Sequence, residues 1–141
     1  MMKRLLFTLA LSLATLSLLD SGYSDNIDYT YMTEWERFTL ALIQVESGGD
    51  SLAVGPTNDL GILQITPIYV REANRLCGDE RYTLECRTSR TKSLEMFEII
   101  QSHYNPDRDI EKGIKLHNPG AGQWYADRIY DKMNELKNNT I

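Results

Sequence analysis

The sequence has few Cys and His residues, which bind metal ions, and no excess of basic residues, which bind the phosphates of nucleic acids. It contains two Cys and two His residues, and 15 Lys and Arg residues stand against 20 Asp and Glu, a formal net charge of −5. Such a chain lacks the broad basic surface that nucleic-acid binding needs, so no nucleic-acid partner is expected. Because the Cys and His residues do not cluster, no metal and no cofactor is expected either.

Long apolar runs are also scarce: the sequence has one, which covers Leu5–Leu19. Its 15 residues are fewer than the roughly 20 that a membrane-spanning helix needs. Lys3 and Arg4 precede it, and a polar stretch ending at Ser24 follows, which is the pattern of a secretory signal peptide. We expect residues 1–24 to be this peptide and the protein to be periplasmic or secreted, without stable membrane insertion after cleavage. An uncleaved anchor is the alternative.

The remaining residues, 25–141, are too few for two well-developed cores and predict a single domain. Removal of Lys3, Arg4 and Asp20 leaves 13 basic and 19 acidic residues, a net charge of −6 on 117 residues. We expect a small, acidic, exported monomer.

Cysteine is absent before Cys77, and the second cysteine is Cys86. In an oxidising compartment such a pair normally closes, so we expect one disulfide. Clamping so short a loop contributes about 2–3 kcal/mol on the chain-entropy model. A zinc site is the alternative, but His103 and His117 are isolated in the sequence.

Helical periodicity runs through almost the whole domain and predicts a mostly α fold. Thr33 and Glu36 form a capping-box signal for a first helix that Ser47-Gly48-Gly49 ends. Thr66-Pro67 opens a second helix to about Leu76. Further helices are expected at 91–104, 107–117 and 121–137. Residues 50–65 lose the helical period and predict a short β-hairpin or an irregular loop.

Glu46 is the residue best placed for acid chemistry, at the C-terminal end of the first predicted helix. The helix dipole disfavours negative charge there, and apolar neighbours remove water from the carboxyl, so both effects favour the neutral form. A neutral carboxylic acid is what a general acid requires. A solvated Glu at a frayed helix end is the alternative.

Three elements in order resemble the lysozyme-like superfamily, especially the soluble lytic transglycosylases and the goose-type lysozymes. These elements are Glu46-Ser47, then Gly61-Ile-Leu-Gln-Ile-Thr-Pro67, and then Leu116-His-Asn-Pro-Gly120. Their order and spacing agree with the family over roughly residues 35–136. The resemblance implies a lysozyme-like α+β fold and cleavage of the bond between N-acetylmuramic acid and N-acetylglucosamine in peptidoglycan.

The resemblance also assigns roles to residues. Glu46 matches the acid that protonates the glycosidic oxygen. The stretch from Gly61 to Gln64 matches a strand edge that lines the sugar cleft, and Ser47 of the first element is expected to bind substrate beside it. Asn118 matches an Asn near the acid and the substrate. His117 departs from the family, because a Tyr precedes that Asn in the transglycosylases. A His can donate a hydrogen bond to Glu46 in its place or can simply fill space.

Asp59 distinguishes two chemistries within the superfamily. The stretch Asp59-Leu-Gly-Ile-Leu-Gln-Ile is similar to one in chicken-type lysozymes whose Asp is the second catalytic carboxylate. A transglycosylase needs no second carboxylate, because the N-acetyl group of the sugar supports the positive charge of the oxocarbenium ion. Glu46 then acts as a base on the C6 hydroxyl, which closes a 1,6-anhydro ring in the sugar. Asn58-Asp59 is also good turn chemistry, so a purely structural Asp59 is the alternative.

Tyr69 adds a flat aromatic face that suits sugar rings, although core packing is the more common use of such a residue. The leading hypothesis is a cofactor-free lytic transglycosylase acting on peptidoglycan glycan strands. A hydrolytic muramidase that uses Glu46 and Asp59 is the second, and a non-catalytic wall-binding protein of the same fold is the third. Because an acidic protein gains no bulk attraction to an anionic wall, recruitment by a secretion or cell-wall complex is a further expectation.

Overall fold

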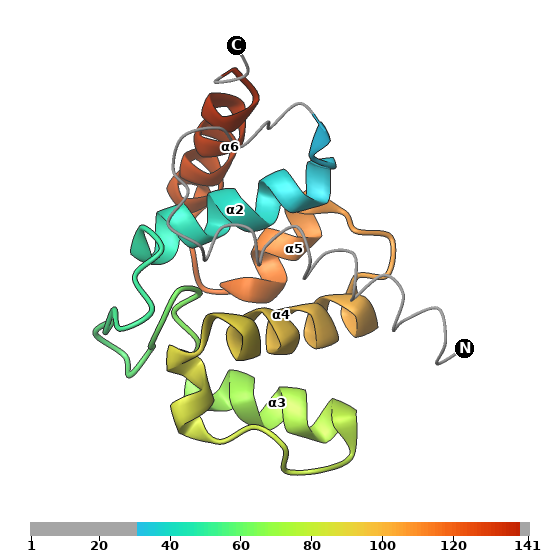
Figure 1. Ribbon diagram of the computed structural model, residues 1–141. Helices are drawn as coiled ribbons and strands as arrows, with labels where there is room; N and C mark the ends of the chain where they lie inside the picture. The colour runs from blue at the N-terminus through green and yellow to red at the C-terminus, as the bar shows by residue number, and fades with distance from the viewer. Residues whose placement is uncertain (1–30, 139–141) are drawn as a thin grey trace.

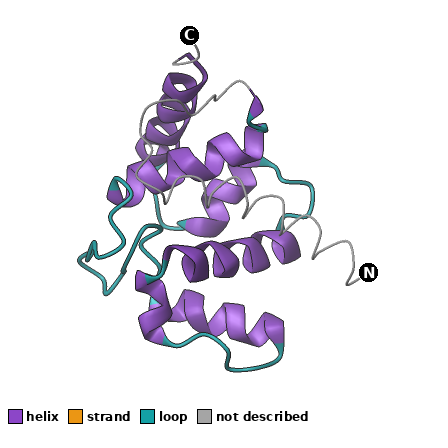
Figure 2. Ribbon diagram, viewed as in Figure 1, coloured by secondary structure: helices purple, strands orange, loops and turns teal. Residues whose placement is uncertain are grey.

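The computed structural model describes residues 31–138 and confirms the mostly α fold class (Figure 2). The helical elements are α2 (Glu34–Ser47), α3 (Pro67–Cys77), the 3-10 helix η3 (Leu84–Thr88), α4 (Arg90–Tyr104), α5 (Ile110–His117) and α6 (Gln123–Asn138). The predicted signal peptide, residues 1–24, lies outside the described residues. Within the described part, no helix is both long and apolar enough to cross a membrane.

Helix α2 begins and ends where its local chemistry requires. The Thr33 hydroxyl accepts the Glu36 backbone N–H, and the Glu36 carboxylate accepts the Thr33 N–H at 2.8 Å, which completes the capping box. At the other end Gly48 adopts φ +65° and donates its N–H to the Gln44 carbonyl oxygen. Glu46 therefore lies in the last turn of a helix with fixed ends.

The core lies where α2, α4, α5 and α6 meet. Phe38 of α2 and Phe97 of α4 are fully buried and in ring contact, with centroids 6.3 Å apart. Gly113 lets α5 approach α2 closely, because a Cβ there would lie 3.0 Å from the Phe38 ring. Figure 1 shows α6 beside α2 and α3 beneath α4. This packing brings the C-terminal ends of α2 and α5 together with the start of α6.

Two predicted helix boundaries were wrong by two or three residues. Helix α5 begins at Ile110 rather than 107, because Arg108 has φ +57° and Asp109 is the N-cap, accepting the Lys112 N–H at 2.7 Å. Helix α6 begins at Gln123 rather than 121. The short helix η3 carries no strong sequence signal and was not predicted.

The segment between α2 and α3 is an irregular loop whose only described pairings are two isolated bridges, Val54 with Leu60 and Leu60 with Ile65. The buried Arg87 holds this loop to η3 by donating to the carbonyl oxygens of Asn58 at 2.6 Å and Ile65 at 3.2 Å. Gly61 has φ +82°, and a Cβ there would meet the Arg87 carbonyl oxygen at 1.9 Å. The loop therefore requires glycine at this position.

The two cysteines lie at the end of α3 and in η3, both half-buried against the core. Their thiols are free in the structure, so the disulfide between Cys77 and Cys86 is not shown and stays a prediction. Burial raises the pKa of the Cys77 thiol, which disfavours its reactive thiolate form.

Candidate active site

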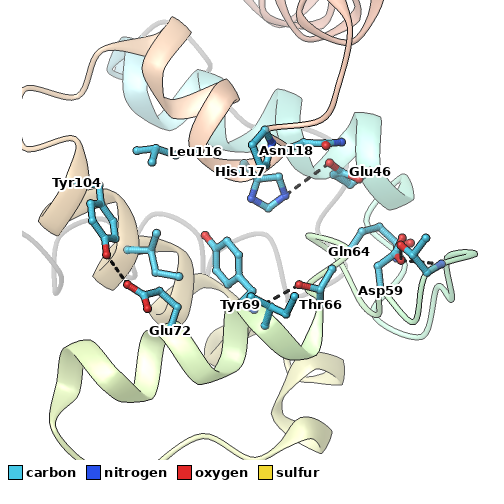
Figure 3. Close-up of a pocket in the computed structure, with 14 residues that line it drawn as sticks. Glu46, Asp59, Gln64, Thr66, Tyr69, Glu72, Tyr104, Leu116, His117 and Asn118 are labelled. Atoms are coloured by element: carbon cyan, nitrogen blue, oxygen red, sulfur yellow. Dashed lines mark hydrogen bonds and ion pairs between the residues drawn. The ribbon is translucent and has the colours of Figure 1, made fainter.

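A pocket of about 550 Å³ brings together residues from α2, the loop after it, α3, α4 and α5 (Figure 3). Six of the predicted site residues line it. The full lining set is Glu46, Thr57, Asp59, Gln64, Thr66, Ile68, Tyr69, Glu72, Ile100, Tyr104, Leu116, His117, Asn118 and Pro119. Ser47 and Gly61 are the two predicted site residues that do not line it. The three sequence elements of the family resemblance therefore converge on one cavity.

Glu46 lies on the pocket wall with 13% of its side chain exposed. Two donors approach its Oε1 oxygen. The Tyr125 hydroxyl hydrogen-bonds this oxygen, and Nε2 of His117 lies 3.5 Å from it. No described Lys or Arg pairs with Glu46. The acid is thus enclosed by a phenol and an imidazole rather than by a permanent cation.

His117 is held by its surroundings in one orientation. Its side chain is 3% exposed, and its ring meets Tyr69 and Phe97 edge-on at 5.6 and 5.9 Å. Nε2 also lies 2.9 Å from the Leu63 carbonyl oxygen. Because a carbonyl oxygen only accepts, a neutral ring must carry its proton on Nε2. That proton is donated to the Leu63 carbonyl oxygen, and Nδ1 is buried without a partner.

Tyr125 is the contact of Glu46 that the sequence did not reveal. It follows Glu46 by 79 residues and reaches it because α6 packs along α2. Burial, followed by the neighbouring Glu46 carboxylate, raises the pKa of Tyr125 well above its usual value, so the phenol stays protonated and donates. Tyr125 is one of the buried residues of α6, together with Ile129 and Met133, and this pattern is typical of core packing and gives no sign of the contact.

Asp59 faces the same pocket and is also a turn residue. Its Oδ1 accepts the Thr57 N–H at 3.0 Å and the Thr57 hydroxyl. A Cβ on Gly55 would lie 1.9 Å from its Oδ2, so only glycine fits there. The backbone amide that Asp59 caps is that of Thr57.

Gln64 and Ser47 hold the loop that forms one pocket wall. The Gln64 side-chain amide donates to the carbonyl oxygens of Ala53 at 3.0 Å and Gly61 at 2.9 Å, which supports its own backbone at φ +47°. These bonds leave Oε1 as the free polar atom of the side chain. Ser47 donates to the Ile62 carbonyl oxygen at 2.9 Å and accepts the Gly49 N–H, so it ties the end of α2 to the loop.

Tyr69 and Asn118 complete the surroundings of the acid. The ring of Tyr69 lines the pocket, but its hydroxyl is buried without a partner, and this burial raises its pKa. Asn118 is exposed at the end of α5, and a hydrogen bond from its side chain favours the ionised form of Tyr125. Among residues 31–138, no three His, Cys, Asp or Glu side chains gather as metal ligands would.

One of three comparisons with known proteins gives a match. Neither the comparison with curated proteins nor that with solved structures gives a match. The family model described as the transglycosylase SLT domain matches residues 26–125, well over half of the 141 residues. The match includes Glu46, the loop after α2, His117, Asn118 and Tyr125. The chain therefore belongs to the transglycosylase SLT domain family of lytic transglycosylase-type enzymes, which act on the peptidoglycan of the cell wall.

Proposed function

We propose that this protein is a peptidoglycan lytic transglycosylase that cleaves the β-1,4 bond between N-acetylmuramic acid and N-acetylglucosamine, with Glu46 as general acid and then general base. One observation carries the proposal. Glu46 lies in the pocket with the Tyr125 hydroxyl hydrogen-bonded to its Oε1 and with Nε2 of His117 3.5 Å from the same oxygen. Because Oε1 faces these two groups, we assign the acidic proton to Oε2, the oxygen left for substrate.

The first step is proton transfer from Oε2 of Glu46 to the glycosidic oxygen. The bond from C1 of N-acetylmuramic acid to that oxygen breaks, and the leaving sugar keeps the proton as a hydroxyl. The carbonyl oxygen of the N-acetyl group supports the positive charge at C1. Glu46 is now a carboxylate with 13% of its side chain exposed, and the Tyr125 hydroxyl stabilises it by hydrogen bonding.

The second step returns the proton. The Glu46 carboxylate removes the proton of the C6 hydroxyl while that oxygen bonds to C1, which closes the 1,6-anhydro ring. Water is not consumed, and Glu46 ends as the neutral acid that began the cycle. Tyr125 and His117 do not contact the reacting atoms in this scheme, so we assign them as positioning residues.

Neutral polar groups supply the sugar contacts. Gln64 offers its free Oε1, and the exposed Asn118 offers both a donor and an acceptor. The Tyr69 ring supplies a flat apolar wall. We infer that Ser47 and Gly61 contribute indirectly, by fixing the loop that carries Gln64.

Hydrolysis by a muramidase is the second candidate, and it is favoured by the presence of Asp59 in the same pocket. In this alternative Asp59 is the second carboxylate and the product is a reducing end. The two hydrogen bonds that Oδ1 accepts from Thr57 favour instead a turn role for Asp59. We further propose that the protein works after export, in the periplasm or outside the cell.

Digestion of purified peptidoglycan tests both candidates. The wild-type protein and Glu46→Gln are incubated with it, and the muropeptides are identified by mass spectrometry. We expect 1,6-anhydro ends from the wild type and none from Glu46→Gln. Reducing ends would replace the transglycosylase by the muramidase, with Asp59→Asn as the next variant. No product from either protein would leave the wall-binding hypothesis.

A further inference from the structure

The loop between α2 and α3 carries two side chains of the pocket, Asp59 and Gln64 (Figure 3). Its backbone is strained beside the first and at the second. Asn58 has φ +64° and Gln64 has φ +47°, in the left-handed region that residues other than glycine rarely adopt. Such conformations persist only where the surrounding structure fixes them. The hydrogen bonds of the Gln64 side chain act within the loop, so the contacts that hold the loop from outside come from other groups.

Arg87 of η3 is a group outside the loop that contacts both strained positions. Its Nη1 donates to the carbonyl oxygen of Asn58 at 2.6 Å and to that of Ile65, the residue after Gln64, at 3.2 Å. Its Nε donates to the Leu84 carbonyl oxygen at 2.8 Å, which fixes the guanidinium on η3. One nitrogen atom therefore joins the two ends of the stretch that carries Asp59 and Gln64.

The backbone of Arg87 contacts the middle of the same stretch. Gly61 lies so close to it that a Cβ there would be 1.9 Å from the Arg87 carbonyl oxygen. This oxygen is itself held, because it accepts the hydroxyl of the fully buried Ser93 of α4 at 3.0 Å. Arg87 thus contacts the stretch at its middle and at both ends.

The charge of Arg87 depends on the loop. The residue is 6% exposed, and no described Asp or Glu forms an ion pair with it. A buried cation is costly unless its N–H groups are satisfied. The loop supplies two of the three carbonyl oxygens to which the guanidinium donates. Displacement of the loop would leave a buried charge short of partners, so the guanidinium and the strained backbone stabilise each other.

We propose that Arg87 is a positioning residue of the proposed reaction, which acts through the loop by holding Gln64 in the orientation that contacts the glycan strand. The inference rests on the proposed function in one respect, namely that the pocket binds a glycan strand. Arg87 does not line the pocket itself. Its effect on substrate is therefore indirect.

The proposed acid is anchored separately from the strained ends of the loop. Glu46 lies on α2, and the side chains of Ile62 and Leu63 are fully buried in the core, which keeps the Leu63 carbonyl oxygen beside His117. Relaxation of the Gln64 backbone would redirect the Gln64 side chain without moving these groups. Loss of Arg87 should therefore weaken glycan binding and leave proton transfer by Glu46 nearly unchanged.

The substitution Arg87→Met tests this separation, because it keeps most of the side-chain length and removes every donor. In the Glu46→Gln protein, which does not turn over, we expect the Kd for soluble glycan strands, measured by calorimetry, to rise about tenfold. In the protein with Glu46 intact, KM for the same strands should rise by a similar factor, while kcat for release of anhydro-muropeptides changes by less than about twofold.

Two further variants separate positioning from general stability. Arg87→Lys keeps the charge but has no planar fork of donors, so its Kd should lie between those of the unsubstituted protein and Arg87→Met. It also supplies the comparison if Arg87→Met does not fold. The matched control is Arg108→Met, which removes a guanidinium whose partners, Glu98 and Ser102, do not line the pocket. It should lower the free energy of unfolding and leave Kd unchanged.

A double variant tests whether Arg87 acts through Gln64. If it does, Gln64→Ala and Gln64→Ala/Arg87→Met should bind glycan strands with Kd values within about twofold of each other, because the second change has nothing left to position. Fully additive losses would overturn the proposal. A loss of stability in Arg87→Met and Arg87→Lys with unchanged Kd and KM, or a fall in kcat alone, would also overturn it.

Failure here and failure of the proposed function give different results. If digestion yields anhydro ends but Arg87→Met and Arg87→Lys bind strands as tightly as the unsubstituted protein, the role of Arg87 alone is wrong. If digestion yields no product but the strands bind and Arg87→Met weakens them, the positioning role stands in a wall-binding protein. If no variant binds glycan strands, both proposals are wrong.

Discussion

Two glutamates of similar burial have opposite surroundings. The side chain of Glu46 is 13% exposed and that of Glu98 is 9% exposed. Glu98 pairs with Arg108 at 2.8 Å and accepts the Trp35 indole N–H at 3.0 Å, while the Arg108 guanidinium also stacks over the Trp35 ring at 4.8 Å. Glu46 contacts a phenol and an imidazole instead.

The difference separates a structural carboxylate from the proposed catalytic acid. Glu98 is paired with a permanent cation, and the pair joins α4 to the segment before α5 and to α2. No described permanent cation pairs with Glu46, as the proposed cycle of proton release and recovery requires, and the Tyr125 hydroxyl stabilises the anion once the proton has left. Glu98 should therefore matter for stability and Glu46 for catalysis.

Loss of the acid is the largest expected effect. Glu46→Gln keeps the shape of the side chain but has no proton to transfer, so we expect kcat for release of anhydro-muropeptides to fall by about 10³-fold, within the usual range for general acid–base catalysis. The free energy of unfolding should not fall, because a buried carboxyl without a cation is replaced by a neutral amide. Product analysis and urea denaturation measure the two quantities.

Glu98→Gln is the matched control for Glu46→Gln. It makes the same chemical change at similar burial, and we expect it to retain kcat. If Glu98→Gln removed activity to the same extent as Glu46→Gln, burial of a carboxylate alone would explain both residues and the contrast between them would disappear.

The second effect concerns the cation of the structural pair. Arg108→Met leaves Glu98 buried with Trp35 as its remaining donor, and we expect a loss of about 2–3 kcal/mol in the free energy of unfolding, less than for a fully buried pair because Arg108 is partly exposed. The double variant Glu98→Gln/Arg108→Met removes both charges and should be less destabilised than Arg108→Met. A double variant that is more destabilised would contradict a buried-charge origin.

The same contrast shows how far the sequence alone predicts this protein. Helix ends were predicted well where a local signal exists, such as the capping box of Thr33 and Glu36 or the Thr66-Pro67 start of α3. Boundaries were missed where a single backbone angle decides, as at Arg108 with φ +57°. Such angles depend on tertiary contacts that no short sequence pattern records.

In the candidate site, Glu46, Gln64, His117 and Asn118 could be predicted from the sequence, because each belongs to one of the three elements that resemble the family. Tyr125 was missed as a partner of Glu46 because that contact depends on the packing of α6 along α2. Glu72 and Tyr104 were missed for the same reason, since their hydrogen bond joins two different helices. The sequence supplies the residues of each element, and the packing of helices decides which of them meet.

The third prediction concerns the imidazole that replaces the family Tyr. His117→Phe keeps a ring against Phe97 but removes the donor near Glu46, so we expect kcat to fall about tenfold with KM little changed. His117→Gln places an amide N–H near the position of Nε2 and should restore most of kcat. Equal loss in both variants would make His117 a packing residue, since only the glutamine retains a donor.

The smallest expected effect concerns the Tyr69 hydroxyl, which we compare with the Tyr125 hydroxyl beside Glu46. The buried Tyr69 hydroxyl has no partner, and burial, followed by the charge of Glu98, raises its pKa. The Tyr125 hydroxyl, by contrast, is hydrogen-bonded to Glu46. Tyr69→Phe keeps the ring that lines the pocket and removes the unpaired group, so we expect the free energy of unfolding to rise by about 1 kcal/mol. Activity should be retained. A fall in stability would mean that the hydroxyl has a partner in solution, such as Nδ1 of His117, and that Tyr69 acts on Glu46 through that ring.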